Sequence, residues 1–158
     1  MDDADIHEFV NEQAIRGLHH AYADVVNRRA WGELDDLFVP DAPIVVDLRT
    51  GEPRRFGGPA ALGEFIGGAV ARFDFFELAL LSARVLLDAT DPTRATGRMY
   101  MNEIRHEHAS GRWSMAYGLY QDEYARTSDG WRFAARHYHS IARTGRDLEV
   151  FEFPPDVI

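Results

Sequence analysis

Apolar side chains recur every three or four residues along the start of the chain. Ile15, Leu18, Tyr22 and Val25 fall on one helical face, and polar or charged residues occupy the other faces. This spacing predicts an amphipathic helix over residues 6–29. Aspartates at positions 2, 3 and 5 come just before it, where negative charge favours the start of a helix.

Two further helices and a strand pair are predicted in the next part of the chain. A short helix is expected over residues 31–38, and the prolines at positions 40 and 43 end it. Residues 44–48 form a strand, and residues 55–56 form a short return strand. A third helix begins near Pro59, because proline suits the first turn of a helix.

The C-terminal half alternates apolar and polar residues over four long stretches. Residues 75–88 and 96–106 predict two strands, and residues 112–143 predict a hairpin around the Asp-Gly pair at positions 129–130. This element order predicts an α+β fold, in which a curved antiparallel sheet wraps around the N-terminal helices as a cone-shaped barrel with a central pocket. The tail after position 146 is expected to pack as an edge or a flap.

Length and composition narrow the class of protein. A chain of 158 residues fits a single domain over residues 1–158. The formal net charge of −9 argues against a nucleic-acid partner, and no apolar run is long enough to span a membrane. The absence of cysteine excludes disulfides and thiolate metal sites and fits a reducing compartment. We therefore expect a soluble cytoplasmic protein.

Several motifs together resemble SnoaL-like domains of the nuclear transport factor 2-like superfamily. They are residues 18–27, residues 31–42, the spaced set Gly118, Tyr120, Asp122 and Tyr124, the run Asp129 to Phe133, and Arg136. The resemblance covers nearly the whole chain and implies the same cone-shaped fold. This superfamily includes scytalone dehydratase, hexachlorocyclohexane dehydrochlorinase, steroid isomerase and polyketide cyclases, so the resemblance does not imply one particular activity. It also implies pairing into a homodimer.

The resemblance points to an Asp–His pair that this chain lacks. Dehydratase-like relatives have an aspartate near the end of the first helix and a histidine on the strand after the third helix. Asn27 stands at the aspartate position, and Leu81 at or beside the histidine position. Neither can do acid–base work. Asn27 either hydrogen-bonds a ligand carbonyl or caps the end of its helix.

Glu103 is the most suggestive candidate for a catalytic group. Its strand face carries Met99, Met101, Glu103 and Arg105, and the resemblance turns this face toward the pocket. A carboxyl group among methionines loses solvation, which raises its pKa toward that of a useful base. Arg105 favours the charged carboxylate instead. Glu103 is therefore either a general base or half of an ion pair with Arg105 near the mouth of the pocket.

Tyr120 is the candidate for holding a substrate oxygen. It shares its strand face with Ala116 and Gly118, and small neighbours leave room for a ligand whose oxyanion the hydroxyl would bind. The alternative is a core tyrosine bonded to a backbone carbonyl. Tyr22, on the apolar stripe of the first helix, has the same two interpretations.

His137 is the best general-base candidate among the histidines. It follows the row Trp131, Phe133 and Ala135, so we expect it to face the pocket. Histidines two residues apart share a strand face, but no third ligand has the spacing of a zinc site. We predict no metal and no other cofactor.

These observations lead to two hypotheses that the sequence leaves open. The first is a cofactor-free lyase or isomerase that performs dehydration, isomerisation or cyclisation on a small hydrophobic molecule with a carbonyl group. Its catalytic residues would be Glu103, His137, Tyr120 and Asn27. Its ligand-binding residues would be Tyr22, Leu81, Met99, Met101, Arg105 and Phe133. The second is a non-catalytic ligand-binding or dimeric scaffold protein of the same fold.

Overall fold

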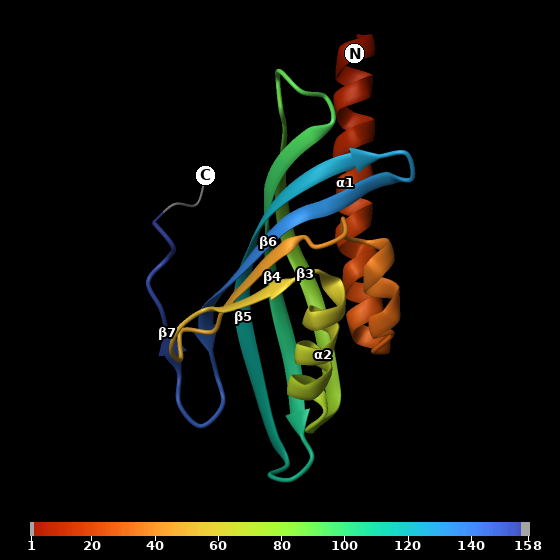
Figure 1. Cartoon of the computed structure of the whole chain (residues 1–158). Helices are drawn as coiled ribbons and strands as arrows, with labels where there is room; N and C mark the ends of the chain where they lie inside the picture. The colour runs from red at the N-terminus through yellow and green to blue at the C-terminus, as the bar shows by residue number, and fades with distance from the viewer. Residues whose placement is uncertain (1, 156–158) are drawn as a thin grey trace.

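A strongly curved β-sheet forms the centre of the molecule, and helices pack against one face of it (Figure 1). The chain is described here from a computed structural model, which covers residues 2–155. The helices are α1 (Asp3–Arg28), the 3-10 helix η1 (Trp31–Asp36) and α2 (Pro59–Val70). The strands are β1 (Pro43–Asp47), β2 (Arg54–Gly57), β3 (Phe73–Leu87), β4 (Arg94–Glu107), β5 (Arg112–Thr127), β6 (Gly130–Arg143) and β7 (Glu149–Val150).

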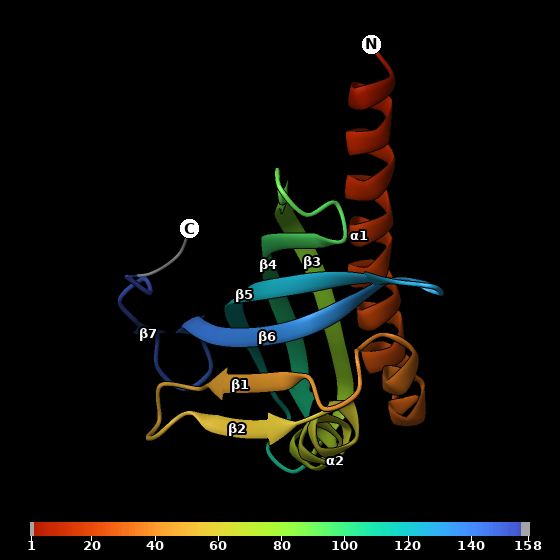
Figure 2. The same ribbon diagram turned by 45° about the horizontal axis from the view of Figure 1, so that its top comes forward.

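The strand order confirms the predicted α+β class and corrects two of its details. Within residues 2–155 the order is β2-β1-β6-β5-β4-β3, with β7 paired to the end of β6 (Figure 2). Strand β1 runs parallel to β6, so the sheet is not antiparallel throughout. Strands β2 and β3 form its two edges and do not pair with each other, so the curved sheet stays open.

Helix α1 begins where the aspartates predicted it to begin. The carboxylate of Asp2 accepts a hydrogen bond from the backbone N–H of Asp5, and the Asp5 carboxylate accepts one from the N–H of Asp2, both at 2.9 Å. The helix ends at Arg29, whose left-handed φ of 57° closes the last turn. No helix within residues 2–155 is long and apolar enough to cross a bilayer.

The long hairpin forms as predicted, with Thr127 paired to Gly130 and a φ of 104° at Gly130. The second predicted helix is shorter than expected. It is a 3-10 helix that ends at Asp36, and Phe38 instead bridges to Phe133 of β6. This bridge ties the segment after η1 to the sheet.

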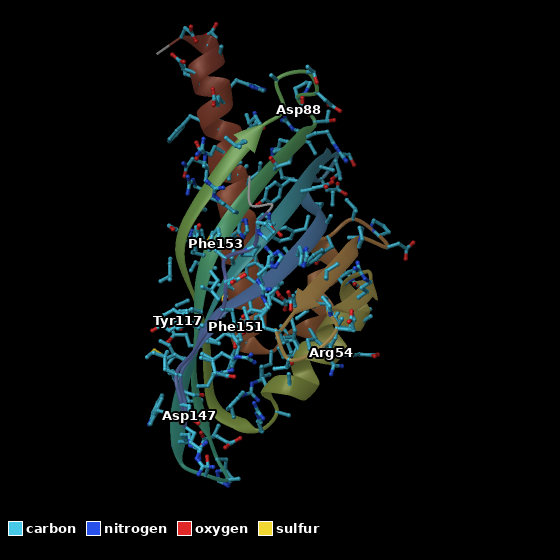
Figure 3. The ribbon with its side chains drawn as sticks, turned by 90° about the vertical axis from the view of Figure 1, so that its left-hand side faces the viewer. Arg54, Asp88, Tyr117, Asp147, Phe151 and Phe153 are labelled. Atoms are coloured by element: carbon cyan, nitrogen blue, oxygen red, sulfur yellow. The ribbon has the colours of Figure 1, made fainter. Side chains whose placement is uncertain are left out.

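The C-terminal tail lies across the sheet face that points away from α1 (Figure 3). The backbone N–H of Phe151 donates to the carbonyl of Ile141 at 2.8 Å, and the Phe153 ring stacks on Tyr100 with centroids 6.4 Å apart. The tail is therefore an extra edge and outer cover of the sheet.

Four β-bulges within residues 2–155 affect which side chains face the helices. Asp74 and Leu81 are skipped in the pairing of β3 with β4, while Ala134 and Ile141 are skipped in the pairing of β6 with β5. Each extra residue reverses the alternation of side chains beyond it. Beyond Ala134, Arg136 therefore points toward the helices, whereas Ala135 and His137 point away from them. Beyond Ile141, Arg143 points toward the helices.

Gly118 allows a close contact between strands β5 and β6. A Cβ atom at this position would overlap Cε2 of Tyr138 and lie 2.8 Å from the sulfur of Met101. The space beside Tyr120 that the small residue was expected to leave for a ligand is therefore filled by the Tyr138 ring. The absence of a side chain at position 118 fixes where that ring lies.

We predict that Gly118→Ala lowers the free energy of unfolding by about 1–3 kcal/mol, because the added methyl group forces the Tyr138 ring to move in a packed interior. Urea unfolding followed by circular dichroism measures this change. Gly17→Ala is the control. Nothing lies within 4 Å of a Cβ at position 17, and alanine is favoured inside a helix. Equal stability of Gly118→Ala and the wild type would contradict the prediction.

Candidate functional site

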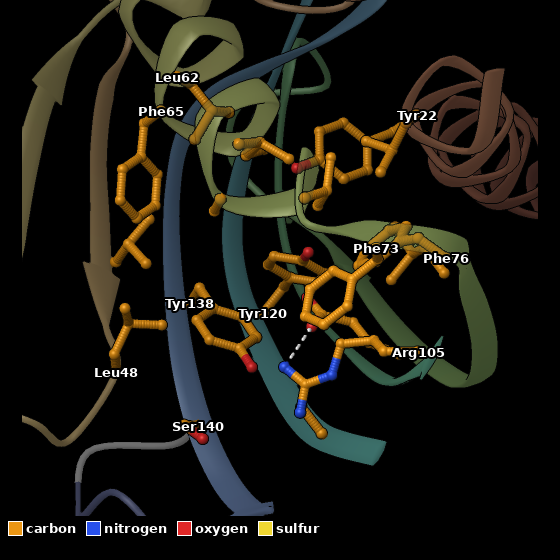
Figure 4. A pocket seen from close by; sticks show the side chains of 18 of the residues that line it. Tyr22, Leu48, Leu62, Phe65, Phe73, Phe76, Arg105, Tyr120, Tyr138 and Ser140 are labelled. Carbon is orange, nitrogen blue, oxygen red and sulfur yellow. Dashed lines mark ion pairs between the residues drawn. The ribbon is translucent and has the colours of Figure 1, made fainter. Parts of the chain in front are cut away.

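A cavity of about 200 Å³ lies between the concave face of the sheet and helices α1 and α2 (Figure 4). Its apolar wall is formed by Val46, Leu48, Leu62, Phe65, Ile66 and Phe76. Most of its polar groups come from strands β4, β5 and β6, namely Glu103, Arg105, Tyr120, Arg136, Tyr138, Ser140 and Arg143. Tyr22 of α1 and Arg72 also line it. A concave, mostly apolar surface with a few polar groups is typical of a small-molecule site.

Glu103 is the one carboxylate among the described residues that line this cavity. Its Oε2 atom lies 3.5 Å from Nη1 of Arg105, and within residues 2–155 no hydrogen bond to the carboxylate is found. The side chain is 25% accessible, through the cavity. Burial raises the pKa of Glu103, and the positive charge of Arg105 partly opposes that rise. A raised pKa makes this carboxylate a stronger base than an exposed one.

Three buried tyrosines meet beside Glu103. The ring centroids of Tyr22 and Tyr120 are 5.9 Å apart, and those of Tyr120 and Tyr138 are 5.4 Å apart. Burial raises the pKa of all three hydroxyls, that of Tyr120 well above its ordinary value. Each hydroxyl therefore stays protonated and remains able to donate a hydrogen bond to a ligand oxygen.

Arg136 lies at the deep end of the cavity and is bound to Asp122. Its Nε and Nη2 atoms donate to the two carboxylate oxygens of Asp122 at 2.7 and 2.9 Å, and both side chains are almost fully buried. The guanidinium carbon lies 4.3, 4.0 and 3.9 Å from the ring centres of Tyr22, Tyr120 and Phe133. This bidentate pair gives Arg136 a structural role beneath the cavity floor.

His19 connects helix α1 to the same pair. Nη2 of Arg136 lies 3.3 Å from Nδ1 of His19, and because arginine has only donors, Nδ1 accepts. The other ring nitrogen then donates to the hydroxyl of Tyr124 at 2.7 Å. Burial first, and then the charge of Arg136, lower the pKa of His19 to about 2. The folded protein therefore holds this imidazole neutral.

Asn27 does not line the cavity but joins α1 to strand β3. Its side-chain amide donates to the carbonyl of Leu78 at 3.1 Å and accepts from the N–H of Leu78 at 2.7 Å. The amide thus pairs with the edge strand β3 as another strand would. Leu78 itself is buried and lines the cavity.

Two predicted site residues lie away from the cavity. Leu81 is the skipped residue of the β3 bulge and is 61% exposed, so it does not shape the cavity. His137 follows the bulge at Ala134 and lies on the opposite sheet face, where its ring stacks on His139 with centroids 3.8 Å apart. It is not placed to act as a base in the cavity.

Three other predicted ligand-binding residues belong to the core. Met99, Met101 and Phe133 are 4%, 0% and 0% exposed, and none of them lines the cavity. They lie on the expected strand faces but are packed within the hydrophobic core. The predicted residues that the structure does bring together around the cavity are Glu103, Arg105, Tyr120 and Tyr22.

The sequence reasoning missed His19, Asp122 and Arg143. His19 follows Ile15 by four residues, so helical spacing placed it on the buried face. Asp122 lies between Tyr120 and Tyr124 on an inward strand face, and it faces Arg136 across the hairpin. No signal of this kind exists for Arg143, because its orientation depends on the bulge at Ile141. Within residues 2–155, no group of three or more histidine or acidic side chains is arranged to hold a metal ion.

An open, curved sheet with helices packed across its concave face around a cavity is an α+β fold of the nuclear transport factor 2-like type. The profile of the SnoaL-like domain family matches residues 8–137, which is most of the chain. The chain therefore belongs to the SnoaL-like domain family.

Solved structures show the same fold at low sequence identity. One is a protein provisionally assigned as a scytalone dehydratase from Novosphingobium aromaticivorans DSM 12444, with a TM-score of 0.77, 18% identity and coverage of 96% of this chain and 97% of that chain. Another is a hexachlorocyclohexane dehydrochlorinase from Novosphingobium barchaimii LL02, with a TM-score of 0.75, 18% identity and coverage of 95% and 99%.

A third similar structure is a nuclear transport factor 2-like protein with a cystatin-like fold from Novosphingobium aromaticivorans. It has a TM-score of 0.71 and 24% identity, and the match covers 87% of this chain and 90% of that chain. No curated protein sequence matches the chain at a significant level. Identities in this range show a shared fold and leave the activity open.

The neutral, buried His19 predicts a specific dependence of stability on pH. Its folded pKa of about 2 lies below the unfolded value of 6.5, so the unfolded chain binds a proton that the folded chain does not. The free energy of unfolding should therefore fall as the pH drops below 6.5, by up to about 1.4 kcal/mol per pH unit from this residue.

Urea unfolding between pH 7 and pH 4 measures this slope. His19→Gln should show a smaller slope over that range, although it is less stable at neutral pH. His20→Gln removes an exposed imidazole from the next position and should keep the wild-type slope. An unchanged slope in His19→Gln would show that His19 is not held neutral in the folded protein.

Proposed function

We propose that this protein is a cofactor-free enzyme that performs acid–base chemistry on a small hydrophobic molecule with a carbonyl group. The observation that carries the proposal is Glu103. Among residues 2–155 it is the one carboxylate that lines this mostly apolar cavity, no hydrogen bond to it is found there, and burial raises its pKa. Groups with perturbed pKa values in cavities are frequent in catalysis. The names of two similar structures denote dehydration and dehydrochlorination, which are both eliminations.

Glu103 would take a proton from the carbon next to the substrate carbonyl, and the electron pair of that C–H bond would move toward the carbonyl oxygen. The hydroxyl of Tyr120, which burial keeps protonated, would donate a hydrogen bond to the developing oxyanion. The resulting enolate has three outcomes. It expels a leaving group from the next carbon, it is reprotonated at another carbon by Glu103, or it attacks a second carbonyl and closes a ring.

A specific observation favours a second candidate, a ligand-binding protein without turnover. The positions where dehydratase-like relatives have their Asp–His pair hold no ionisable group. Position 27 is an asparagine that binds the backbone of Leu78, and the cavity-facing residue beside it on β3 is Leu78 itself. In this case the cavity would bind the same class of molecule, and Glu103 would only contribute charge.

We predict that Glu103→Gln lowers the rate of conversion by about 10²–10⁴-fold, because the amide cannot accept the proton, while ligand affinity stays within a few-fold. Ligands are first found by thermal unfolding against aromatic, steroid and polycyclic ketones, since a ligand of the folded state raises the unfolding temperature. Products are then followed by mass spectrometry. In the wild type, kcat/KM should fall as the pH drops through the raised pKa of Glu103.

Glu123→Gln is the matched control. It removes a mostly exposed carboxylate from the neighbouring strand β5 and should leave conversion unchanged. Conversion that is equally fast in Glu103→Gln would exclude Glu103 as the base. Ligands that bind both proteins alike without being converted would support the binding protein instead.

A further inference from the structure

Arginines gather around the cavity although the protein as a whole is acidic. The net charge is −9, and all 17 basic residues are arginines because the sequence contains no lysine. Four of them line the cavity, namely Arg72, Arg105, Arg136 and Arg143, against the single carboxylate of Glu103. The excess of positive charge around so small a cavity has to be balanced by other charges.

Two of the four arginines are poor candidates for binding a ligand. Arg136 is held by both oxygens of Asp122. Arg72 lies at the rim, where its side chain is 65% exposed and 3.8 Å from Glu107. Arg105 and Arg143 are less exposed than Arg72, at 14% and 20%, and unlike Arg136 neither has a carboxylate bound to two of its nitrogens. Nη2 of Arg143 donates to the carbonyl of Leu48 at 2.7 Å. Among residues 2–155, the Nε–H groups of Arg105 and Arg143 are buried donors for which no hydrogen-bond partner is found, and the same holds for Nη1 of Arg136.

The fold turns both of these guanidinium groups toward one end of the cavity. Arg105 follows Glu103 on the inward face of β4, and the bulge at Ile141 turns Arg143 inward on β6. Burial raises the pKa of Tyr138, and the charges of Arg105 and Arg143 both oppose that rise, so both lie within electrostatic reach of its hydroxyl. Figure 4 shows the Tyr138 hydroxyl and the Arg105 guanidinium directed toward the same region.

We call this region the polar end of the cavity: Glu103, Arg105, Tyr138, Ser140 and Arg143. Its buried charges are two positive and one negative. Glu149, 3.6 Å from Arg143, is 57% exposed and contributes little because water screens it. One positive charge is left over, which a single carboxylate would neutralise. The planar fork of a guanidinium also matches the two oxygens of a carboxylate.

We infer that the ligand of this cavity is an amphipathic carboxylic acid, whose carboxylate binds Arg105 and Arg143 while its aromatic or aliphatic part packs against the apolar wall. This inference deepens the proposed function. It rests on the proposed function in one respect, namely that the bound acid is the substrate. It adds a recognition group at the end of the cavity opposite Arg136 and does not change the role of Glu103.

Isothermal titration calorimetry at pH 7.5 with two pairs of neutral and anionic isosteres tests the inference. The pairs are benzoate with benzamide and 2-naphthoate with 2-naphthamide. At least one acid should bind the wild-type protein about 10- to 100-fold more tightly than its amide, as expected for hydrogen bonds to charged groups. Equal binding of acid and amide in both pairs, or no binding by either acid, overturns the inference. Tighter binding of 2-naphthyl phosphate would assign the site to a phosphate instead and also overturns it.

Substitutions of single arginines test which side chains bind the carboxylate of the acid. Arg105→Gln and Arg143→Gln should each weaken binding of the acid by about tenfold or more and leave the amide nearly unaffected. Arg143→Lys keeps the charge but loses the fork and should fall between the wild type and Arg143→Gln. Arg98→Gln removes an arginine from the same strand as Arg105 but outside the cavity, and should bind like the wild type. An acid preference that survives in both Arg→Gln variants overturns the assignment.

These experiments distinguish failure of the proposed carboxylate site from failure of the proposed enzymatic function. A preference for acids that depends on Arg105 and Arg143 would stand even if conversion were independent of Glu103, and the proposed function would then fail alone. Conversion that requires Glu103, with neutral and anionic ligands bound equally well, would keep the enzyme and remove the carboxylate site.

Discussion

The buried pair of Arg136 and Asp122 is the interaction on which the rest of this structure depends. Bringing two charges out of water costs several kcal/mol for each ion, and only good geometry offsets that cost. Here both carboxylate oxygens are bound, and three aromatic rings surround the guanidinium. Since removing one partner would leave the other charge buried and unpaired, the two strands and the rings around them are held together as a unit.

This unit also positions side chains around the cavity. Arg136 orients His19 of α1 and holds Tyr22 and Tyr120 at the cavity floor, so the helix and the sheet meet in one arrangement. On β4, Gly97 is level with this pair, and Met101 and Glu103 follow it on the inward face. Met101 is fully buried in the core, whereas Glu103, two residues further along, lines the cavity.

Most of the fold could be predicted from the sequence, because each long strand alternates and the Asp-Gly turn fixes the hairpin register. For the site, the alternation placed Glu103, Arg105 and Tyr120 around the cavity, and helical spacing placed Tyr22 there. The errors have different causes. The bulges at Ala134 and Ile141 each reverse a period of two, which no count along one strand can detect. They moved His137 out of the site and brought Arg143 into it. Leu81 was placed by the resemblance, although alternation from Leu78 already puts it on the other face, and Met99, Met101 and Phe133 are buried in the core.

The register of the sheet links the proposed base to the proposed carboxylate site. Leu78, Glu103, Ala116 and Arg143 are successive partners across β3, β4, β5 and β6, and all of them line the cavity. Neighbouring strands lie about 4.8 Å apart, so the backbones at Glu103 and Arg143 are separated by roughly 10 Å across the small Ala116. A substrate held by its carboxylate at Arg143 would present to Glu103 the carbons only a few bonds from that carboxylate. Because the neutral Asn27 and Leu78 offer no second base, proton transfer would be confined to that part of the molecule.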